Sequence, residues 1–177
     1  MQAFATDIIT RAALAAGLPE GRVMEQSAAD NLTIPRPRLE LQFLPERYTR
    51  TGRTLAYRRT KTELVRKREL YVVELSAAAN ALAEDRAWLA AFCYDFAAAL
   101  PAGANDSRGN WVKIRAEKAT FSRPADKRVG DTIIAVFEKA NQLFSLSFTW
   151  RITVEEAENL IPSFTLNTHW KGGRNGD

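Results

Sequence analysis

The sequence has little of the chemistry from which active sites and metal sites are built. Its 177 residues include one cysteine, Cys93, and one histidine, His169. A single cysteine excludes a disulfide within the chain and is typical of proteins in a reducing compartment. One cysteine and one histidine also supply too few ligands for a zinc site within one chain. We therefore expect no metal and no cofactor.

Groups suited to catalysis are equally sparse. His169 lies in the C-terminal tail, where the rigid partners that acid–base catalysis needs are not expected. Cys93 falls in the apolar stripe of a predicted helix, where a free cysteine behaves as a small hydrophobic residue. The acids Glu155, Glu156 and Glu158 fit a solvated turn better than a metal cluster. With no phosphate-binding loop either, we predict no catalytic residue and a protein that assembles rather than an enzyme.

Long hydrophobic runs are also missing. No window approaches the roughly 18 apolar residues that a membrane span needs. The N-terminal segment has no lysine or arginine before its apolar residues and carries Asp7 and Arg11 among them, unlike a secretion signal. The hydrophobic content of 46% and charged content of 26% are those of an ordinary globular protein. We expect one soluble domain over residues 1–177, made in the cytoplasm, with no membrane partner.

Positive charge, in contrast, is concentrated in one stretch. Residues 47–68 hold nine basic residues and one acid, a charge of +8, so the rest of this +4 chain carries −4. The basic residues are Arg47, Arg50, Arg53, Arg58, Arg59, Lys61, Arg66, Lys67 and Arg68. A molecule polarised in this way suits an acidic partner such as DNA, and equally a head-to-tail contact with its own copies.

The stretch from 38 to 75 is predicted to begin and end as β-strand. Residues 39–43 alternate between apolar and polar side chains, and residues 70–75 are almost entirely apolar. Between these strands, residues 44–69 are predicted to protrude as a basic hairpin or arm. Within this arm, residues 53–62 are rich in threonine and tyrosine but lack a clean apolar face, which leaves a strand and a part-ordered loop as alternatives.

Two helices are predicted. The first covers residues 6–16, with Thr6 or Asp7 as its cap and Gly17 as its stop. The second covers residues 81–100. Its apolar side chains form a single stripe at helical spacing: Trp88, Leu89, Phe92, Cys93, Phe96 and Leu100. This helix is expected to seal the core.

Turn signals divide the remaining strands. Pro45 predicts an interruption or an edge after the first strand, and Thr51-Gly52 predicts a tip or a bend. The segments 101–110 and 122–131 are loops by composition. Asn141-Gln142 is interpreted as the turn of a hairpin.

The second half of the chain is predicted to be mainly strand. Residues 111–121 alternate, and the hairpin strands cover residues 132–139 and 143–154. The last of these has the cleanest alternation in the protein, with Phe144, Leu146, Phe148, Trp150, Ile152 and Val154 on one face. Residues 155–177 are predicted to form a C-terminal tail. Together these elements give an α+β domain, a mostly antiparallel sheet with two helices packed on one face.

The basic arm has three possible interpretations. It can be a solvated hairpin whose charges prevent edge-to-edge pairing. It can face DNA, with arginine and lysine meeting phosphates without reading bases. It can also reach an acidic surface on a neighbouring subunit, where arginine favours paired contacts.

The layout resembles bacteriophage tail terminator (tail completion) proteins. A first amphipathic helix precedes the polar β-excursion RYTRTGRTLAYRRTKTELVRKREL, which precedes the helix EDRAWLAAFCYDFAAALP and a closing antiparallel hairpin. The resemblance implies a virion protein, made in the bacterial cytoplasm, whose subunits close into a ring, usually a hexamer, on the last ring of the tail tube. Its partners would be its own copies, the tail tube protein and the head or neck connector protein, with DNA passing through the lumen.

Two alternatives stay open: a small basic nucleic-acid-binding protein, and another head–tail connector or neck protein. In the ring hypothesis, residues 47–68 are dispensable for the fold and essential for assembly. Reversing Arg58, Arg59, Arg66 and Arg68 to glutamate is then predicted to abolish assembly. Surface changes of this kind alter stability by about 0.5 kcal/mol or less each.

Overall fold

The structure is a computed structural model, and it describes residues 1–25, 35–60, 62–121, 127–129, 132–134 and 141–160. The two helices are α1 (Gln2–Ala15) and α2 (Arg86–Ala99). The strands are β1 (Val23–Glu25), β2 (Arg38–Phe43), β3 (Arg47–Arg59), β4 (Glu63–Leu82), β5 (Gly103–Asn105), β6 (Trp111–Phe121), β7 (Lys127–Val129), β8 (Thr132–Ile134) and β9 (Asn141–Asn159).

The predicted α+β class is confirmed. Seven strands form one sheet in the order β1-β2-β4-β9-β6-β5, with β3 paired to β4 beside this path. Among the described strands of this sheet, only β1 and β2 run parallel, and all other neighbours are antiparallel. β7 and β8 pair with each other in a separate two-stranded sheet.

Two long strands, β4 and β9, form the centre of this sheet. They pair along almost their whole lengths, from Leu82 opposite Asn141 to Glu63 opposite Asn159. The other edge of β4 is shared by β2 and β3, which follow each other along it with a break around Pro45. The predicted interruption at Pro45 is therefore confirmed.

One part of the sheet is covered by both helices, and we call this part with its helices the body. The stripe of α2 packs as predicted, because Leu89, Phe92, Cys93 and Phe96 are all buried. The Phe96 ring meets Phe144 of β9 edge-on, with ring centroids 5.0 Å apart. Buried alanines of β4, at positions 77, 79 and 81, allow the helices to approach the sheet closely.

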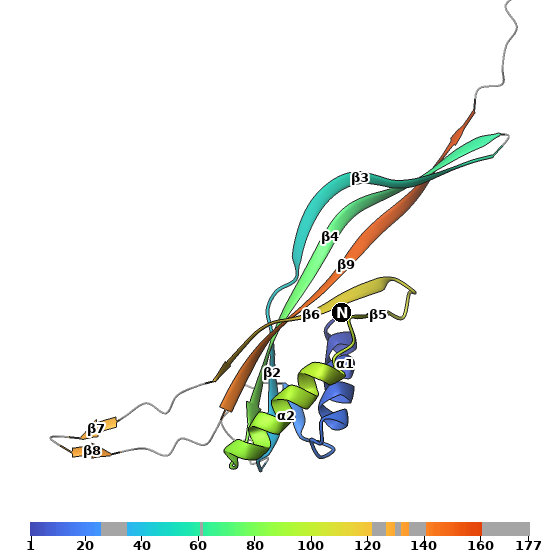
Figure 1. Cartoon of the computed structure of the whole chain (residues 1–177). Helices are drawn as coiled ribbons and strands as arrows, with labels where there is room; N and C mark the ends of the chain where they lie inside the picture. The colour runs from blue at the N-terminus through green and yellow to red at the C-terminus, as the bar shows by residue number, and fades with distance from the viewer. Residues whose placement is uncertain (26–34, 61, 122–126, 130–131, 135–140, 161–177) are drawn as a thin grey trace, which may run out of the picture.

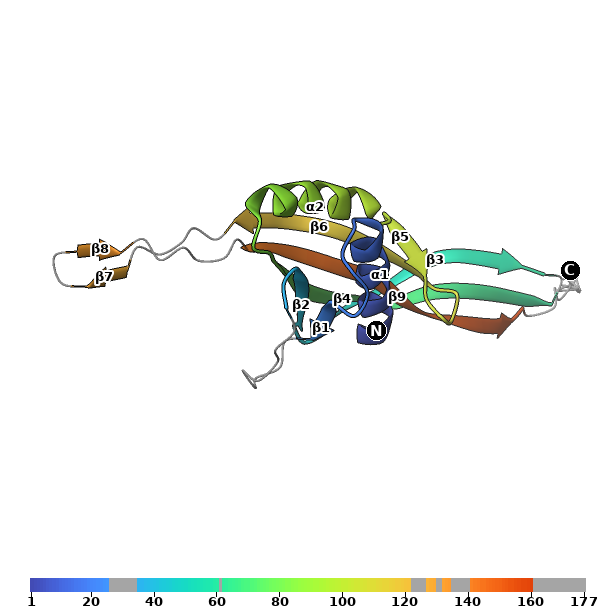
Figure 2. The ribbon, with the colours of Figure 1, turned by 90° about the horizontal axis from the view of Figure 1, so that it is seen from below.

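The other part of the sheet extends away from the helices as a three-stranded ribbon (Figures 1 and 2). We call it the ribbon, consisting of β3, residues 63–72 of β4 and residues 151–159 of β9. Every residue of β3 is exposed except Leu55, which is half-buried. The strand alternative for the arm is thus correct. Gly52, at φ +63°, lies within a register shift of β3, so the Thr51-Gly52 signal marks a bend rather than the tip.

The helix predicted over residues 81–100 begins later than expected. Residues 81 and 82 end β4, and α2 starts after Asp85, whose side chain accepts a hydrogen bond from the Ala87 N–H at 2.8 Å. The alanines before this cap favour helix by propensity, but they pair with β2 and β9 on both sides. Tertiary pairing overrides their intrinsic preference.

The hairpin predicted at Asn141-Gln142 is wrong. Both residues lie in β9, where Gln142 pairs with Ala81 of β4 and with Phe121 of β6. A strand with partners on both sides outweighs a local turn signal. β8 covers only residues 132–134 of the expected strand over 132–139, and residues 135–140 lie outside the described part of the chain.

Four further boundaries are corrected. The first helix begins at Gln2 rather than near residue 6, without a side-chain cap. The loop predicted over 101–110 contains β5, where Gly103 is required because a Cβ atom there would lie 2.4 Å from the Trp111 ring. The loop predicted over 122–131 contains β7. The tail predicted over 155–177 is wrong for residues 155–159, which continue β9, and residues 161–177 lie outside the described part of the chain.

Candidate interaction surface: the basic ribbon

The five arginines of β3 are the most exposed charges of the predicted arm. Arg47, Arg50, Arg53, Arg58 and Arg59 are all exposed, and none forms an ion pair with any residue that the structure describes. β3 also pairs only with β4, so its outer backbone edge is unoccupied in the described chain. The strand therefore offers guanidinium groups and unpaired backbone groups side by side.

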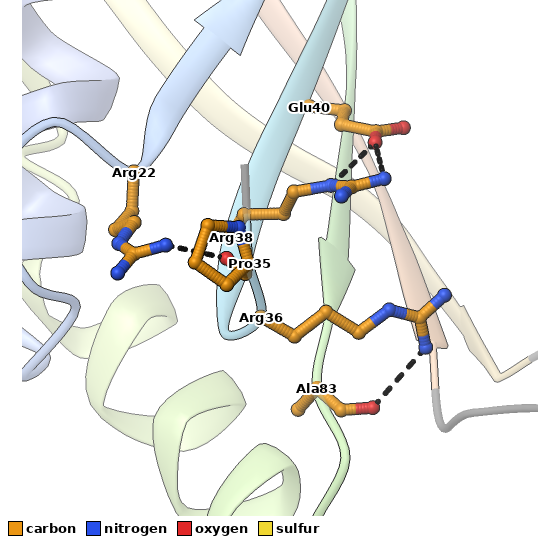
Figure 3. Close-up of polar contacts among 6 residues, drawn as sticks. All are labelled: Arg22, Pro35, Arg36, Arg38, Glu40 and Ala83. Carbon is orange, nitrogen blue, oxygen red and sulfur yellow. Dashed lines mark hydrogen bonds and ion pairs between the residues drawn. The ribbon is translucent and has the colours of Figure 1, made fainter. Parts of the chain in front are cut away.

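Arginines of the body are arranged differently (Figure 3). Arg22 donates a hydrogen bond to the Pro35 carbonyl at 2.7 Å, and Arg36 donates one to the Ala83 carbonyl at 3.4 Å. Arg38 forms an ion pair with Glu40 at 2.7 Å. Arg22 and Arg36 therefore hold the segment before β2 against its neighbours and Arg38 pairs within β2, whereas the β3 arginines form no ion pair with any described residue.

Arginines of β4 are intermediate between the unpaired arginines of β3 and the bonded arginines of the body, because β9 places acids beside them. Arg66 forms an ion pair with Glu158 at 2.9 Å, and Arg68 forms one with Glu156 at 3.2 Å. All four side chains remain about half exposed. Lys67 is exposed, and Lys61 lies outside the described residues.

A buried acid lies at the junction of the ribbon and the body. Glu69 is 4% exposed, and its carboxylate forms an ion pair with Arg151, whose Nε atom lies 2.9 Å away. A buried carboxylate costs free energy unless it is paired. Arg151 is therefore required where the strands leave the cover of the helices.

A groove of about 930 Å³ lies where α1, the start of β3, the β5–β6 loop and β9 meet. Several of its charged groups pair with each other. Asp7 pairs with Arg11, and Glu46 lies 3.8 Å from the N-terminal amine. Glu46 also accepts a hydrogen bond from the Tyr48 hydroxyl at 2.6 Å, which raises the pKa of Tyr48. The groove is therefore lined in part by charges that pair with each other.

The residues considered for chemistry are placed as follows. Cys93 is buried in α2, and burial raises the pKa of its thiol to about 11, so the thiol is protonated and weakly nucleophilic at neutral pH. His169 lies outside the described residues. Within the described ranges, no group of histidine, cysteine and acidic side chains is placed to hold a metal ion. In the same ranges, no helix has the length and apolarity required to cross a membrane.

The glutamates of β9 are functional candidates that the sequence pattern did not identify. Glu155, Glu156 and Glu158 were assigned to a solvated turn, because the apolar alternation of the last strand stops near Val154. They instead continue β9 beside the basic arm. The sequence pattern does not reveal the full length of β4, and this length is the reason: so long a strand needs partners along it, and two strands alone are marginally stable.

The fold and the ribbon together define the class of protein. It is an α+β subunit with a helix-covered body and a charged ribbon that extends beyond it. The sequence matches no protein-family model, and no curated protein matches it either. What the ribbon can bind therefore decides which function fits best.

Proposed function

We propose that this protein is a structural subunit of a bacteriophage tail, which assembles with its own copies into a ring and acts as a tail terminator. The observation that carries the proposal is the exposed basic edge strand β3, held on a ribbon away from the body. Residues 47–68 carry +8 and the rest of the chain −4. Unlike patches on one molecule favour heterologous contacts, which generate closed rings when the rotation between copies closes.

In this proposal the ring, a hexamer as in the proteins that the layout resembles, caps the tail tube and ends its polymerisation. Its other side offers the surface to which the head docks. The partners are the protein's own copies, the tail tube protein and a head or neck connector protein. DNA crosses the central hole, and the site of action is the virion.

Light scattering with mass determination, at several concentrations of the full chain, tests the proposal. We expect a defined multiple of the chain mass, and closed rings in electron micrographs. Arg58→Glu with Arg59→Glu should abolish assembly. Arg86→Glu with Arg115→Glu, a matched reversal of two exposed arginines off the ribbon, should leave it intact. A wild type that stays monomeric, and that also fails to cap isolated tail tubes, contradicts the proposal.

A second candidate function is favoured by the same five arginines of β3. If they bind the phosphates of duplex DNA, affinity should fall steeply with salt. The slope of log K against log salt would be about −4.5 for five neutralised phosphates. Fluorescence anisotropy with a labelled duplex measures this slope. Undetectable binding at low salt removes this candidate.

A further inference from the structure

The ribbon has two edges that no described strand pairs with, and they carry opposite charge. β3 forms one edge, and among the described strands it pairs only with β4. β9 forms the other, because its pairing with β6 ends at Thr149 and leaves the rest of that edge unpaired in the described chain. β3 holds five arginines and no acid, a charge of +5. Residues 151–159 hold three glutamates and one arginine, a charge of −2.

Strand register places an arginine and a glutamate at opposite edges on each face of the ribbon. Arg59 pairs with Leu64, which pairs with Glu158, so these three side chains share one face. Successive side chains point to opposite faces of a sheet. Arg58 and Glu155 therefore lie on the other face, again at opposite edges. Each face runs from a cationic edge to an anionic edge.

The strand directions also fit a ring. β3 and β9 are both antiparallel to β4, so they run parallel to each other. Ribbons of subunits related by rotation about one axis can therefore lie side by side and point the same way. In that arrangement β3 of one copy meets β9 of the next, which is a heterologous contact.

We propose that β3 pairs as a parallel strand with β9 of the next copy, so that the ribbons of a ring join into one continuous intermolecular sheet. This inference rests on the proposed ring and names the surfaces that close it. A contact between two β3 strands would set five arginines against five, which is repulsive. Only the unlike edges attract, so the charges select the neighbouring copy and its orientation.

The glutamates of β9 can keep their ion pairs within the chain and also contact an arginine of the next copy. An ionised carboxylate has two oxygens and accepts about four hydrogen bonds. Glu158 can therefore keep its ion pair with Arg66 of its own chain and receive Arg59 of the next. The two edge strands also hold half-buried apolar side chains that a neighbouring strand would cover further: Leu55 on β3 and Val154 on β9.

Complementary charge reversal tests the proposed pairing. One variant carries Arg58→Glu and Arg59→Glu on β3, and the other carries Glu155→Arg and Glu158→Arg on β9. Each variant alone sets like charges together at every contact and should stay monomeric by light scattering. An equimolar mixture restores unlike charges at every contact and should recover assemblies of the wild-type mass. Thermal unfolding of each variant checks that the subunits fold.

The outcomes separate this inference from the proposed function. If each variant alone assembles like the wild type, the edges are not the contact, while the ring itself stands. If both variants fail and the mixture fails as well, the edges bind something else, such as nucleic acid, and the inference is overturned. If the wild type is monomeric in solution and on tail tubes, both proposals are overturned.

A disulfide provides an independent measurement. Within one chain Arg59 and Glu158 are separated by β4, two strand spacings or about 9.6 Å, too far for a bond between cysteines. After mild oxidation, Arg59→Cys with Glu158→Cys should give a ladder of linked chains on a non-reducing gel. Tyr94→Cys with Asp95→Cys on α2 is the matched control and should give none. Absence of a ladder from an assembled variant overturns the parallel pairing.

Discussion

The body and the ribbon are built from the same two strands, yet they differ in almost every physical respect. In the body, Leu75 of β4 and the facing Phe148 of β9 are completely buried. Further along the same pair, Arg66 and Glu158 are 42% and 53% exposed in their side chains. One pair of strands therefore supplies both a core and a charged surface, and the difference lies in whether helices cover it.

This difference sets the scale of the energies in each region. Burying a large apolar side chain in the body contributes about 1.5–3 kcal/mol. An exposed ion pair of the ribbon contributes about 0.2–1 kcal/mol. The body therefore determines the stability of the subunit, while the ribbon can be changed in charge at little cost. Four predictions test this division.

The largest effect is expected from a cavity in the body. Phe96→Ala removes a fully buried ring that contacts Phe92 and Phe144, and should lower the free energy of unfolding by about 3–5 kcal/mol. Denaturant titration measures the loss. Tyr94→Ala, on the exposed side of the same helix, should stay within about 0.5 kcal/mol. Equal effects of the two changes would show that α2 does not seal the core.

The junction between the regions should show an intermediate effect. Arg151→Ala leaves the buried carboxylate of Glu69 without its ion pair, which should cost about 1–3 kcal/mol. Adding Glu69→Gln removes the unpaired charge and should recover part of the loss. A double-mutant cycle of thermal or denaturant unfolding measures the coupling. Additive losses would mean that the pair contributes nothing specific.

The buried thiol of the body predicts a dependence on pH. The pKa of Cys93 is raised in the folded protein, to about 11, so the unfolded chain loses this proton first. The contribution is therefore fully present below about pH 8.5, the unfolded thiol value, and is lost between there and pH 11. The loss is about 1.4 kcal/mol per pH unit. Comparing the wild type with Cys93→Ala isolates it, and parallel pH profiles would contradict it.

The smallest effects are expected within the ribbon. The sequence predicts the same small loss of stability for reversing Arg58, Arg59, Arg66 and Arg68, whereas the structure pairs only the last two with acids. Arg66→Glu with Arg68→Glu breaks two ion pairs and should cost about 0.2–1 kcal/mol for each pair. Arg58→Glu with Arg59→Glu breaks none and should stay within about 0.5 kcal/mol for each site. Thermal unfolding of the monomer compares the two variants. Equal stability would show that the ion pairs with β9 are not formed in solution.

Much of the fold could be predicted because alternation is a local signal. The bounds of β6 were predicted correctly, as were the buried faces of β2 and α2. The errors fall where a local preference competes with pairing: alanines at the end of β4, Asn141-Gln142 at the start of β9, and the acids at its end. In each case the sheet extends the strand beyond its apolar pattern.

The sequence by itself determined which strands have a core face, where the positive charge lies, and that cysteine and histidine are nearly absent. Only the tertiary structure decided which acids lie beside that charge. Arg68 and Glu156 are 88 positions apart in the chain, and no local pattern connects them. The register of β4 against β9 brings them together, because pairing across a sheet joins residues by strand order and direction rather than by distance along the sequence.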